Sequence, residues 1–301
     1  SAVGNIKNTI VELNLRYPLD SAGFLFLDDT IYSFTNLNRL VLLGNFSGVL
    51  SERIMELSEL KSLQIENTRI GDKLPSSLGM LKYVESIQLQ NNQFTGTIPN
   101  SLSSLSKLKI MSLRSNRLSG KIPLGLYNMD SLIVLNLSSN RLLDTIPEIL
   151  GSNKYIQNIN LADNSIFGEI PSDIKGASNL VYLDLSLNVI SGEIPSEIGR
   201  LNQLQELKLL SNKLIGGIPI SLLEHPKLAN LWLDNNQLTE PVLLTTLGPK
   251  LNILTVQENL LTFEDLIHVV DSFNTQLGFF RYAPQKTAGE RDTFSARLGC
   301  P

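Results

Sequence analysis

The sequence predicts an α/β repeat solenoid, because one unit of fixed length recurs through most of the chain. Seven of the 13 prolines stand 24 residues apart, at Pro75, Pro99, Pro123, Pro147, Pro171, Pro195 and Pro219. A fixed period of this size is typical of coils stacked in one direction, each contacting only its neighbours. We expect about eleven coils, which together build a long surface rather than a single deep catalytic pocket.

Residues 1–36 are expected to close the start of the stack. A degenerate unit begins at Ile10, and residues 18–36 break the period with the segment PLDSAGFLFLDDTIYSFTN. The end of a solenoid needs a cover, because its apolar edge would otherwise aggregate. We expect the aromatic side chains of this segment to cover the first regular coils: Phe24, Phe26, Tyr32 and Phe34.

Residues 37–261 form the regular part of the solenoid, and Leu108–Pro123 is a representative unit. Its pattern is L-x-x-L-x-L-x-x-N-x-L-x-G-x-I-P, with methionine at the second leucine. The alternation in L-x-L predicts a short strand with one buried face. The isoleucine–proline pair predicts an extended segment after the asparagine rather than a helix. Each coil holds only half a core, so stacking is obligatory.

An asparagine recurs at one position of the coil: Asn92, Asn116, Asn140, Asn164, Asn188, Asn212, Asn236 and Asn259. An amide has two donors and an acceptor, so we expect a continuous ladder of hydrogen bonds to the backbone. Thr68 takes this position in one coil. A glycine follows in five coils, and Asp72 and Asp144 take its place in two others. The recurrent glycine predicts a left-handed backbone angle at this position.

This unit resembles the plant-type leucine-rich repeat, over roughly residues 37–262. The resemblance implies a right-handed superhelix whose concave face carries one long parallel β-sheet. It also implies short 3₁₀ turns on the convex side. Plant receptor ectodomains with this repeat usually carry paired cysteines in both caps, whereas Cys300 is the single cysteine of this chain.

Residues 262–301 are expected to cover the other end of the stack. LTFEDLIHVVDSF predicts a capping helix with Thr262 as its N-cap, and LGFFRYAPQKTAGERDTF predicts a terminal strand. Together these segments resemble the ends of repeat segments in large bacterial surface proteins. That resemblance implies one binding segment of a longer secreted polypeptide.

Composition excludes some classes of partner and agrees with a secreted or cell-surface protein. The net charge is −4, whereas a nucleic-acid-binding protein would need a basic stripe. No run of apolar residues is long enough to insert into a membrane. Asn45 and Asn136 begin Asn-x-Ser sequons, which would be glycosylated only in a eukaryotic secretory pathway. The repeat would produce the Asn136 motif in any case.

The sequence carries no motif of catalysis, metal binding or cofactor binding. No phosphate-binding loop, zinc motif or nucleophile elbow is present. We expect His225 and His268 to be surface or cap residues, and Cys300 to be a spare thiol without a partner. We therefore predict no catalytic residue, no metal and no cofactor.

Residues between the two strand leucines are expected to point out of the concave sheet. In chain order they are Asn14, Val41, Gln64, Gln88, Ser112, Asn136, Asn160, Asp184, Lys208, Trp232 and Thr255. Amides and hydroxyls dominate the first two-thirds of this face. Three adjacent coils near its end instead carry aromatic, charged and apolar side chains, and they include Leu187 and Asn235. We predict the ligand site on these three coils and call it the concave patch. Its residues are Tyr182, Asp184, Glu206, Lys208, Leu210, Trp232 and Asp234.

Trp232, the single tryptophan, is the strongest indicator of a binding site in this patch. Aromatic side chains on an outward column are typical anchors of interfaces. The alternative is local cover, with the ring lying flat over Lys208 and Leu210. Asp184 and Lys208 are neighbours across two strands and could simply pair with each other.

We therefore predict a non-catalytic binding module for an extended ligand, either a protein or peptide segment or a polysaccharide. One alternative is a structural spacer or adhesin segment without a specific concave ligand. Another is a glycosidase inhibitor, because polygalacturonase-inhibiting proteins share this repeat. The sequence leaves the oligomeric state open.

Overall fold

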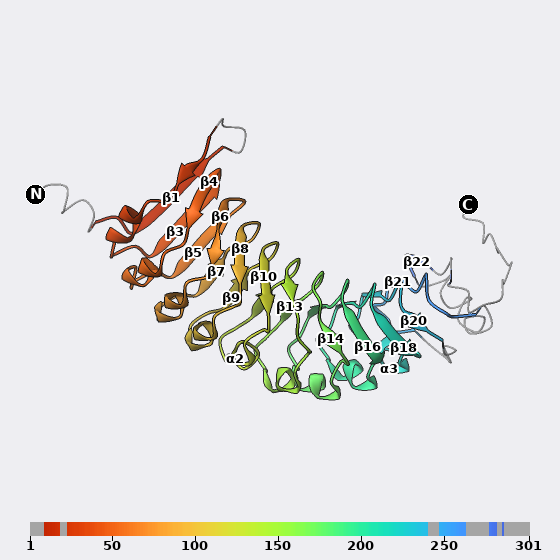
Figure 1. Cartoon of the computed structure of the whole chain (residues 1–301). Helices are drawn as coiled ribbons and strands as arrows, with labels where there is room; N and C mark the ends of the chain where they lie inside the picture. The colour runs from red at the N-terminus through yellow and green to blue at the C-terminus, as the bar shows by residue number, and fades with distance from the viewer. Residues whose placement is uncertain (1–8, 19–22, 240–246, 263–276, 282–284, 286–301) are drawn as a thin grey trace, which may run out of the picture.

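The molecule is a curved row of stacked coils, with the helical turns along its outer edge (Figure 1). The structure is a computed structural model, and it describes residues 9–18, 23–239, 247–262, 277–281 and 285. Each regular coil contributes one strand to the inner face, a second strand to one side, and a short helical turn to the outer edge. The predicted solenoid is confirmed.

The inner face is one sheet of twelve parallel strands, named here the concave sheet. Successive coils stack in register, so that Asn136 of one strand lies beside Asn160 of the next. The strands, in sheet order, are β1 Glu12–Tyr17, β3 Arg39–Gly44, β5 Ser62–Glu66, β7 Ser86–Gln88, β9 Ile110–Ser112, β11 Val134–Asn136, β13 Asn158–Asn160, β15 Tyr182–Asp184, β17 Glu206–Lys208, β19 Asn230–Trp232, β21 Ile253–Thr255 and β22 Phe279–Arg281.

A second layer of parallel strands, the side sheet, follows the asparagine of each coil. This layer confirms the predicted extended segment. Its first part is β2 Leu25–Phe26, β4 Phe46–Val49, β6 Arg69–Lys73, β8 Gln93–Gly96, β10 Arg117–Gly120 and β12 Arg141–Leu142. Its second part is β14 Phe167–Gly168, β16 Val189–Glu193, β18 Lys213–Gly216 and β20 Gln237–Leu238. A single bridge between Thr145 and Phe167 links the two parts.

The outer edge consists of short turns, most of which begin directly after a repeat proline. The fixed φ of proline suits the residue before a helical turn, and its missing N–H leaves no donor unpaired there. The 3₁₀ turns are η1 Asp29–Ser33, η2 Glu52–Glu56, η3 Ser76–Met80, η4 Asn100–Ser104, η5 Glu148–Ser152, η6 Ser172–Gly176 and η7 Ser196–Arg200. Two further turns are single α-helical turns, α2 Leu124–Tyr127 and α3 Ile220–Leu223.

The core is a continuous column of aliphatic side chains running the length of the stack. In the coil that begins at Leu108, every repeat leucine, methionine and isoleucine up to Ile122 is at most 2% exposed. Each coil packs against the next, so apolar area is removed from water on both sides of the coil. The stability of one coil therefore depends on both neighbours.

The predicted asparagine ladder is confirmed. Asn140 donates from Nδ2 to the carbonyl of Leu137 in its own coil and to that of Leu113 in the preceding coil, each at 3.0 Å. Its Oδ1 accepts from the backbone N–H of Leu118, also in the preceding coil. The same pair of bonds to two coils recurs at Asn92, Asn116, Asn164, Asn188, Asn212, Asn236 and Asn259.

The glycine position is left-handed, as predicted, with φ between +71° and +78° in five coils. Asp72 also adopts a left-handed φ of +66°, but the prediction was wrong for Asp144. That residue holds its turn with its side chain, which accepts from the backbone N–H groups of Ile122 and Thr145. A second left-handed position, directly before the asparagine, was not predicted: Asn67, Asn91, Ser115, Ser139, Asp163, Leu187, Ser211, Asn235 and Glu258.

The expected aromatic cover at the N-terminal end was wrong for two of its four residues. Tyr32 is buried, and its hydroxyl accepts from the backbone N–H of Ser51. Phe24 and Phe26 are instead 40% and 74% exposed. They flank or belong to β2, the edge strand of the side sheet, so no further strand covers their faces.

Near the C-terminal end, β22 pairs in parallel with β21 and adds a strand after Leu261. The terminal strand predicted from the sequence is therefore present. Gln285 bonds to the last coil, accepting from the N–H of Asn259 and donating to the carbonyl of Val256. The predicted capping helix after Thr262, with His268, and the predicted free thiol of Cys300 lie outside the described residues.

Candidate functional site on the concave face

Three of the eleven residues expected to point out of the concave sheet are buried. Val41 is 1% exposed, Asp184 7% and Thr255 0%, so the prediction was wrong there. Val41 lies in register between the longer side chains of Asn14 and Gln64. Asp184 accepts hydrogen bonds from Tyr182 and Ser186, and Thr255 donates to Asp234.

Two amides of the concave face, Asn136 and Asn160, serve local turns. Oδ1 of Asn136 accepts from the N–H of Ser138 at 3.1 Å, and Oδ1 of Asn160 accepts from the N–H of Ala162 at 3.0 Å. Asp184 makes the same contact with Ser186. These side chains satisfy the backbone where each strand ends. Asn136 and Asn160 therefore have a structural role at these positions.

The concave patch lies on three neighbouring strands and forms two rows. Tyr182 of β15 lies beside Glu206 of β17, and Asp184 lies beside Lys208, which lies beside Trp232 of β19. All but the two aspartates are partly exposed. The strands thus bring together five of the predicted site residues: Tyr182, Asp184, Glu206, Lys208 and Trp232. Leu210 and Asp234 lie in the turns that follow β17 and β19.

Lys208 pairs with Glu206 of its own strand rather than with Asp184. The distance from Lys208 Nζ to Glu206 Oε1 is 2.8 Å, and the ammonium lies 5.3 Å from the centroid of the Tyr182 ring. Partial burial lowers the pKa of Lys208, but the hydrogen bond to Glu206 and the nearby negative charges outweigh it, and the pKa is raised overall. Lys208 therefore stays protonated, and the patch presents a fixed pair of opposite charges.

The two aspartates of the patch face inward and orient their neighbours. Oδ2 of Asp184 accepts from the Tyr182 hydroxyl at 3.0 Å. Burial, followed by the charge of Asp184, raises the pKa of Tyr182 to about 12. Asp234 accepts from the hydroxyl of Thr255 and from the backbone N–H of Gln257. A ligand on this face would meet Tyr182 rather than the carboxylates.

Trp232 carries the one unsatisfied group of the patch. Its ring is partly buried, and its indole Nε1 is inaccessible to solvent and has no hydrogen-bond partner in the described part of the chain. A buried donor left unpaired costs about 1–3 kcal/mol. The cation–π contact of Lys208 is made with Tyr182, so the interpretation of Trp232 as a simple cover for Lys208 gains no support.

Leu187 extends the patch by one apolar side chain. It is 52% exposed, its backbone φ is +55°, and its N–H donates to the carbonyl of Leu210 in the next coil. A leucine in a left-handed conformation is strained, and most other coils place Asn, Ser or Asp at this position. The signal available in the sequence was this departure within an otherwise regular column.

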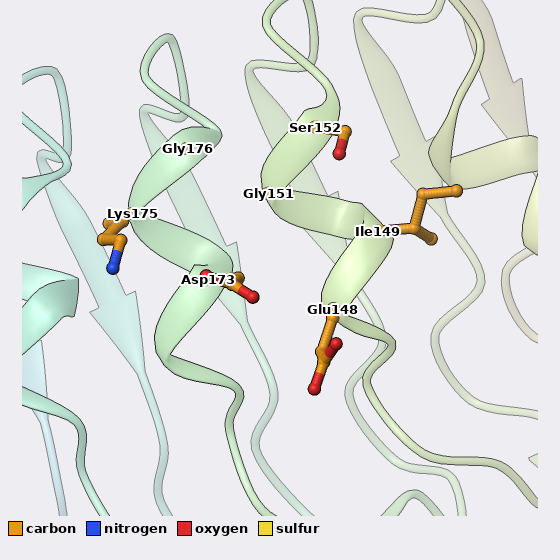
Figure 2. A pocket seen from close by; sticks show the side chains of 7 residues that line it. All are labelled: Glu148, Ile149, Gly151, Ser152, Asp173, Lys175 and Gly176. Atoms are coloured by element: carbon orange, nitrogen blue, oxygen red, sulfur yellow. The ribbon is translucent and has the colours of Figure 1, made fainter.

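The convex side carries shallow depressions. Figure 2 shows one of about 430 Å³ between η5 and η6, lined by Glu148, Ile149, Gly151, Ser152, Asp173, Lys175 and Gly176. The two turns approach so closely that a Cβ atom on Gly151 would collide with the Asp173 carbonyl. The side chains of the depression do not converge on one point, as Figure 2 also shows. Nothing in this arrangement forms a catalytic constellation.

His225 was predicted at the surface, and this prediction was wrong. The side chain is 1% exposed, with Nε2 3.2 Å from the carbonyl of Leu201 and Nδ1 accepting from the N–H of Leu228. The imidazole bridges two coils from a position that most other coils fill with an apolar residue. Across the described residues, no three metal-ligating side chains converge, and no helix is long and apolar enough to cross a bilayer.

The sequence sequons are also explained by the repeat. Asn45 is 8% exposed, and it stands at the ladder position of its coil. The side chain of Asn136 is engaged with both Ser138 groups, its N–H and its hydroxyl. A glycan attaches to Nδ2, so at Asn45 it would require exposure of a buried side chain, whereas the Asn136 contacts occupy only Oδ1. Because the repeat accounts for both motifs, neither sequon by itself indicates a secretory pathway.

Comparison with protein families and solved structures supports the repeat assignment. The family model described as Leucine Rich Repeat matches residues 83–105, 107–129, 131–153 and 179–201. A search of curated proteins finds no significant match. Among solved structures, the plant peptide hormone receptor RGFR1 in complex with RGF2 is 28% identical and has a TM-score of 0.74. The match covers 86% of this chain and 42% of the receptor chain.

Two further solved structures have the same fold. PEPR1–AtPEP1 is 26% identical, with a TM-score of 0.73, and covers 94% of this chain and 43% of its own. The ectodomain of GASSHO1/SCHENGEN3 from Arabidopsis thaliana, in complex with CASPARIAN STRIP INTEGRITY FACTOR 2, is 24% identical, with a TM-score of 0.74. It covers 94% of this chain and 39% of its own, so the chain spans about two-fifths of these proteins. The matched segments of the chain are leucine-rich repeats, and its coils and its asparagine ladder resemble those of the plant-type repeat.

Proposed function

We propose that this chain is a non-catalytic binding module that recognises an extended peptide through its concave face. The similar structures of RGFR1 and PEPR1 are complexes with RGF2 and AtPEP1, and the first is named as a peptide hormone receptor. The same comparison supports a secreted or cell-surface location, which belongs to this proposal. That the whole protein has a peptide partner is likewise proposed here.

The observation that carries the proposal is the unsatisfied indole N–H of Trp232 within a partly exposed patch. A peptide offers a carbonyl acceptor at every residue. Because Nε1 is inaccessible in the present conformation, the ring must rotate before a ligand acceptor reaches it. The hydrogen bond formed then recovers the cost of the unpaired donor.

The rest of the concave patch supplies orientation and apolar contact. Lys208 has ammonium protons beyond the one that contacts Glu206, and the Glu206 carboxylate has a second oxygen. These groups match the polar atoms of a peptide. Leu210 and Leu187 form an apolar shelf beside them. Asp184 positions Tyr182 through the hydroxyl contact and is a positioning residue.

A peptide is favoured over a polysaccharide by the state of the amides. Several short polar side chains of the early coils, including Asn136 and Asn160, are engaged with their own strand ends. Their Oδ1 acceptors are thus occupied, which leaves them fewer groups for the hydroxyls of a long glycan. A spacer without a ligand remains the contrary outcome of the experiment below.

The test is selection of displayed peptides on the purified chain, followed by titration of enriched synthetic peptides. Trp232→Ala should weaken binding by at least about 2 kcal/mol, roughly 30-fold, because anchor residues at interfaces dominate affinity. Ser112→Ala, an outward residue in an early coil, is the matched control and should leave the affinity unchanged.

Two outcomes would contradict the proposal. If no peptide is enriched over a denatured sample of the chain, the spacer interpretation is favoured, and a glycan array is the next search. If enriched peptides bind wild type and Trp232→Ala equally, with both proteins melting alike, the site lies elsewhere on the molecule.

A further inference from the structure

Two buried polar atoms of the concave face have no hydrogen-bond partner, and they lie far apart along the stack. Within the described residues five side-chain N or O atoms are buried and unpartnered, and Trp232 Nε1 and Gln90 Oε1 are the two on this face. Gln90 follows β7, two residues after Gln88, in the column of the sheet that also contains Leu210. A buried acceptor without a donor costs free energy, as a buried donor without an acceptor does.

Gln90 differs from the amides beside it, because its side chain makes no hydrogen bond in the described part of the chain. Nε2 of Gln64 donates to Glu66 at 2.7 Å, and Nε2 of Gln88 donates to Ser86 Oγ at 3.1 Å. The side chain of Gln90 is only partly buried. Once it rotates, both ends of its amide are therefore available to a ligand.

Arg114 stands in the next coil at the same position as Gln90. The backbone N–H of Asn91 donates to the carbonyl of Arg114 at 2.9 Å, which holds the two turns side by side. The Arg114 side chain is exposed, and it belongs to none of the four ion pairs of the described residues. A guanidinium presents a planar fork of donors that fits a carboxylate. Gln90 and Arg114 are named here the second subsite.

The separation between the second subsite and Trp232 sets the length of a ligand that reaches both. In the concave sheet β7 and β19 are six strand spacings apart. At about 4.8 Å per spacing this separation is about 29 Å, which an extended peptide spans with about nine residues at about 3.3 Å each.

The coils between the two sites leave room for such a peptide. Three of them carry short, buried side chains in the column of Gln90: Ser138, Ala162 and Ser186. The hydroxyls of both serines donate to side chains at the ends of their own strands. Because no bulky side chain stands between Arg114 and Leu210 in this column, an extended backbone can run along it, across the strands.

We propose, on the basis of the peptide-binding function above, that the second subsite binds an acidic residue of the peptide that Trp232 anchors. The backbone N–H of this residue donates to Gln90 Oε1, and its side-chain carboxylate accepts from the Arg114 guanidinium. The preferred ligand is an extended peptide of at least about nine residues, with Asp or Glu at one end. That end lies on β7 and β9, toward the N-terminus of the row (Figure 1).

Glu66, on the other side of Gln90, does not prevent this contact. Its carboxylate is partly buried and already accepts from Gln64. Glu66 and Arg114 stand two coils apart, about 10 Å at about 4.8 Å per spacing. This is close to the Debye length of about 10 Å at an ionic strength of about 0.1 M, so the repulsion is largely screened. The guanidinium contact is direct and is screened less.

The first test is selection on the purified chain from two displayed libraries of random peptides, of about 12 and about 6 residues, of which only the longer spans both sites. Displayed peptides are fused to their carrier through the C-terminus, so an enriched acidic group is a side chain. The longer library should yield tighter peptides with Asp or Glu toward one end. Selection on Arg114→Ala should lose this preference. Selection on Arg117→Ala, an exposed cation of the same coil on the side sheet, is the matched control and should keep it.

Titration of an enriched synthetic peptide and of its amide analogue, both with amidated C-termini, gives a double-mutant cycle. Arg114→Ala should weaken the acidic peptide roughly tenfold and leave the analogue nearly unchanged, because only the first loses a charge-assisted contact. Gln90→Met should weaken both peptides without lowering the urea midpoint, since the free protein loses no hydrogen bond. A purely structural role of Gln90 would lower the midpoint instead.

Failure of the second subsite can be told from failure of the proposed function. If Trp232→Ala weakens the peptides but no acidic preference appears, the second subsite is wrong and the peptide-binding function stands. The same holds if Arg114→Ala behaves like Arg117→Ala, or if the short peptides bind as tightly as the long ones. If neither library yields a peptide, both proposals are wrong.

Discussion

Asn153 and His225 stand at the same position of two coils and make the same three hydrogen bonds. Oδ1 of Asn153 accepts from the N–H groups of Tyr155 and Ile156, and its Nδ2 donates to the carbonyl of Met129. Nδ1 of His225 accepts from the N–H groups of Lys227 and Leu228, and Nε2 contacts the carbonyl of Leu201. The imidazole therefore acts as an amide, which requires its neutral form with the proton on Nε2.

This equivalence predicts a pH dependence that asparagine should remove. Burial lowers the pKa of His225 from its ordinary 6.5. As the pH falls below 6.5, the unfolded chain binds a proton that the folded chain does not, so the free energy of unfolding decreases. The His225→Asn variant should keep the bridge and lose this component.

The measurement is the urea midpoint of wild type and His225→Asn at pH 7 and at pH 5. The carboxylates titrate alike in both proteins, so the difference between them isolates the imidazole. Equal losses of stability in wild type and variant would contradict the neutral bridge.

Replacing a ladder asparagine should destabilise the whole stack. Asn140→Leu leaves the buried Leu118 N–H without its acceptor and removes one of the two amide donors of each of the Leu113 and Leu137 carbonyls. We expect a loss of about 1–3 kcal/mol in the free energy of unfolding, the cost of buried groups left unpaired. Denaturant melts measure it, with Asn128→Ala on an exposed turn as control. An unchanged midpoint would show that water replaces the amide.

Leu187→Asn should stabilise the fold while weakening any ligand bound at the apolar shelf. Asparagine tolerates the left-handed angle of +55°, which strains leucine by about 1 kcal/mol. The variant should therefore melt at a higher temperature than wild type. A lower melting temperature would mean that the exposed leucine makes contacts that outweigh its backbone strain.

Truncation after Leu261 should make the chain aggregate. It removes β22 and Gln285, and so uncovers Leu254 and Val256, which are 2% and 0% exposed. A bare parallel edge with apolar side chains pairs readily with other chains. Light scattering at rising concentration is the measurement, and a truncated protein that stays monomeric and melts normally would refute the prediction.

The repeat made the fold predictable, because its strands, its ladder and its glycine turns each depend on a residue type that recurs. Asn140 and its equivalents were predicted to bond the backbone because an amide must. The departures were less predictable. Asp144 lacks the left-handed backbone angle of the glycine position, and its side-chain hydrogen bonds hold the turn instead. Phe26 is exposed on an edge strand that the periodicity of the sequence did not indicate.

The candidate site was predicted in part, for a similar reason. The outward column located Tyr182, Lys208 and Trp232 on adjacent strands, since register follows from the period. The choice of partners was not predictable, because Lys208 contacts Glu206 two residues away on its own strand. The orientation of Asp184 was not predictable either, because it depends on the hydrogen bond from the Tyr182 hydroxyl. The spacing of residues does not determine the rotation of a side chain.

The asparagine ladder has a direction, and this direction bears on how the chain is made. Every ladder amide completes the turn of the coil that precedes it, as Asn140 does for Leu113 and Leu118. On a ribosome, the newest coil therefore emerges with its turn unsatisfied and is completed only when the following asparagine has been synthesised. Growth adds one such unfinished coil at a time, and within the described residues Gln285 supplies the last side chain that bonds backward to the stack.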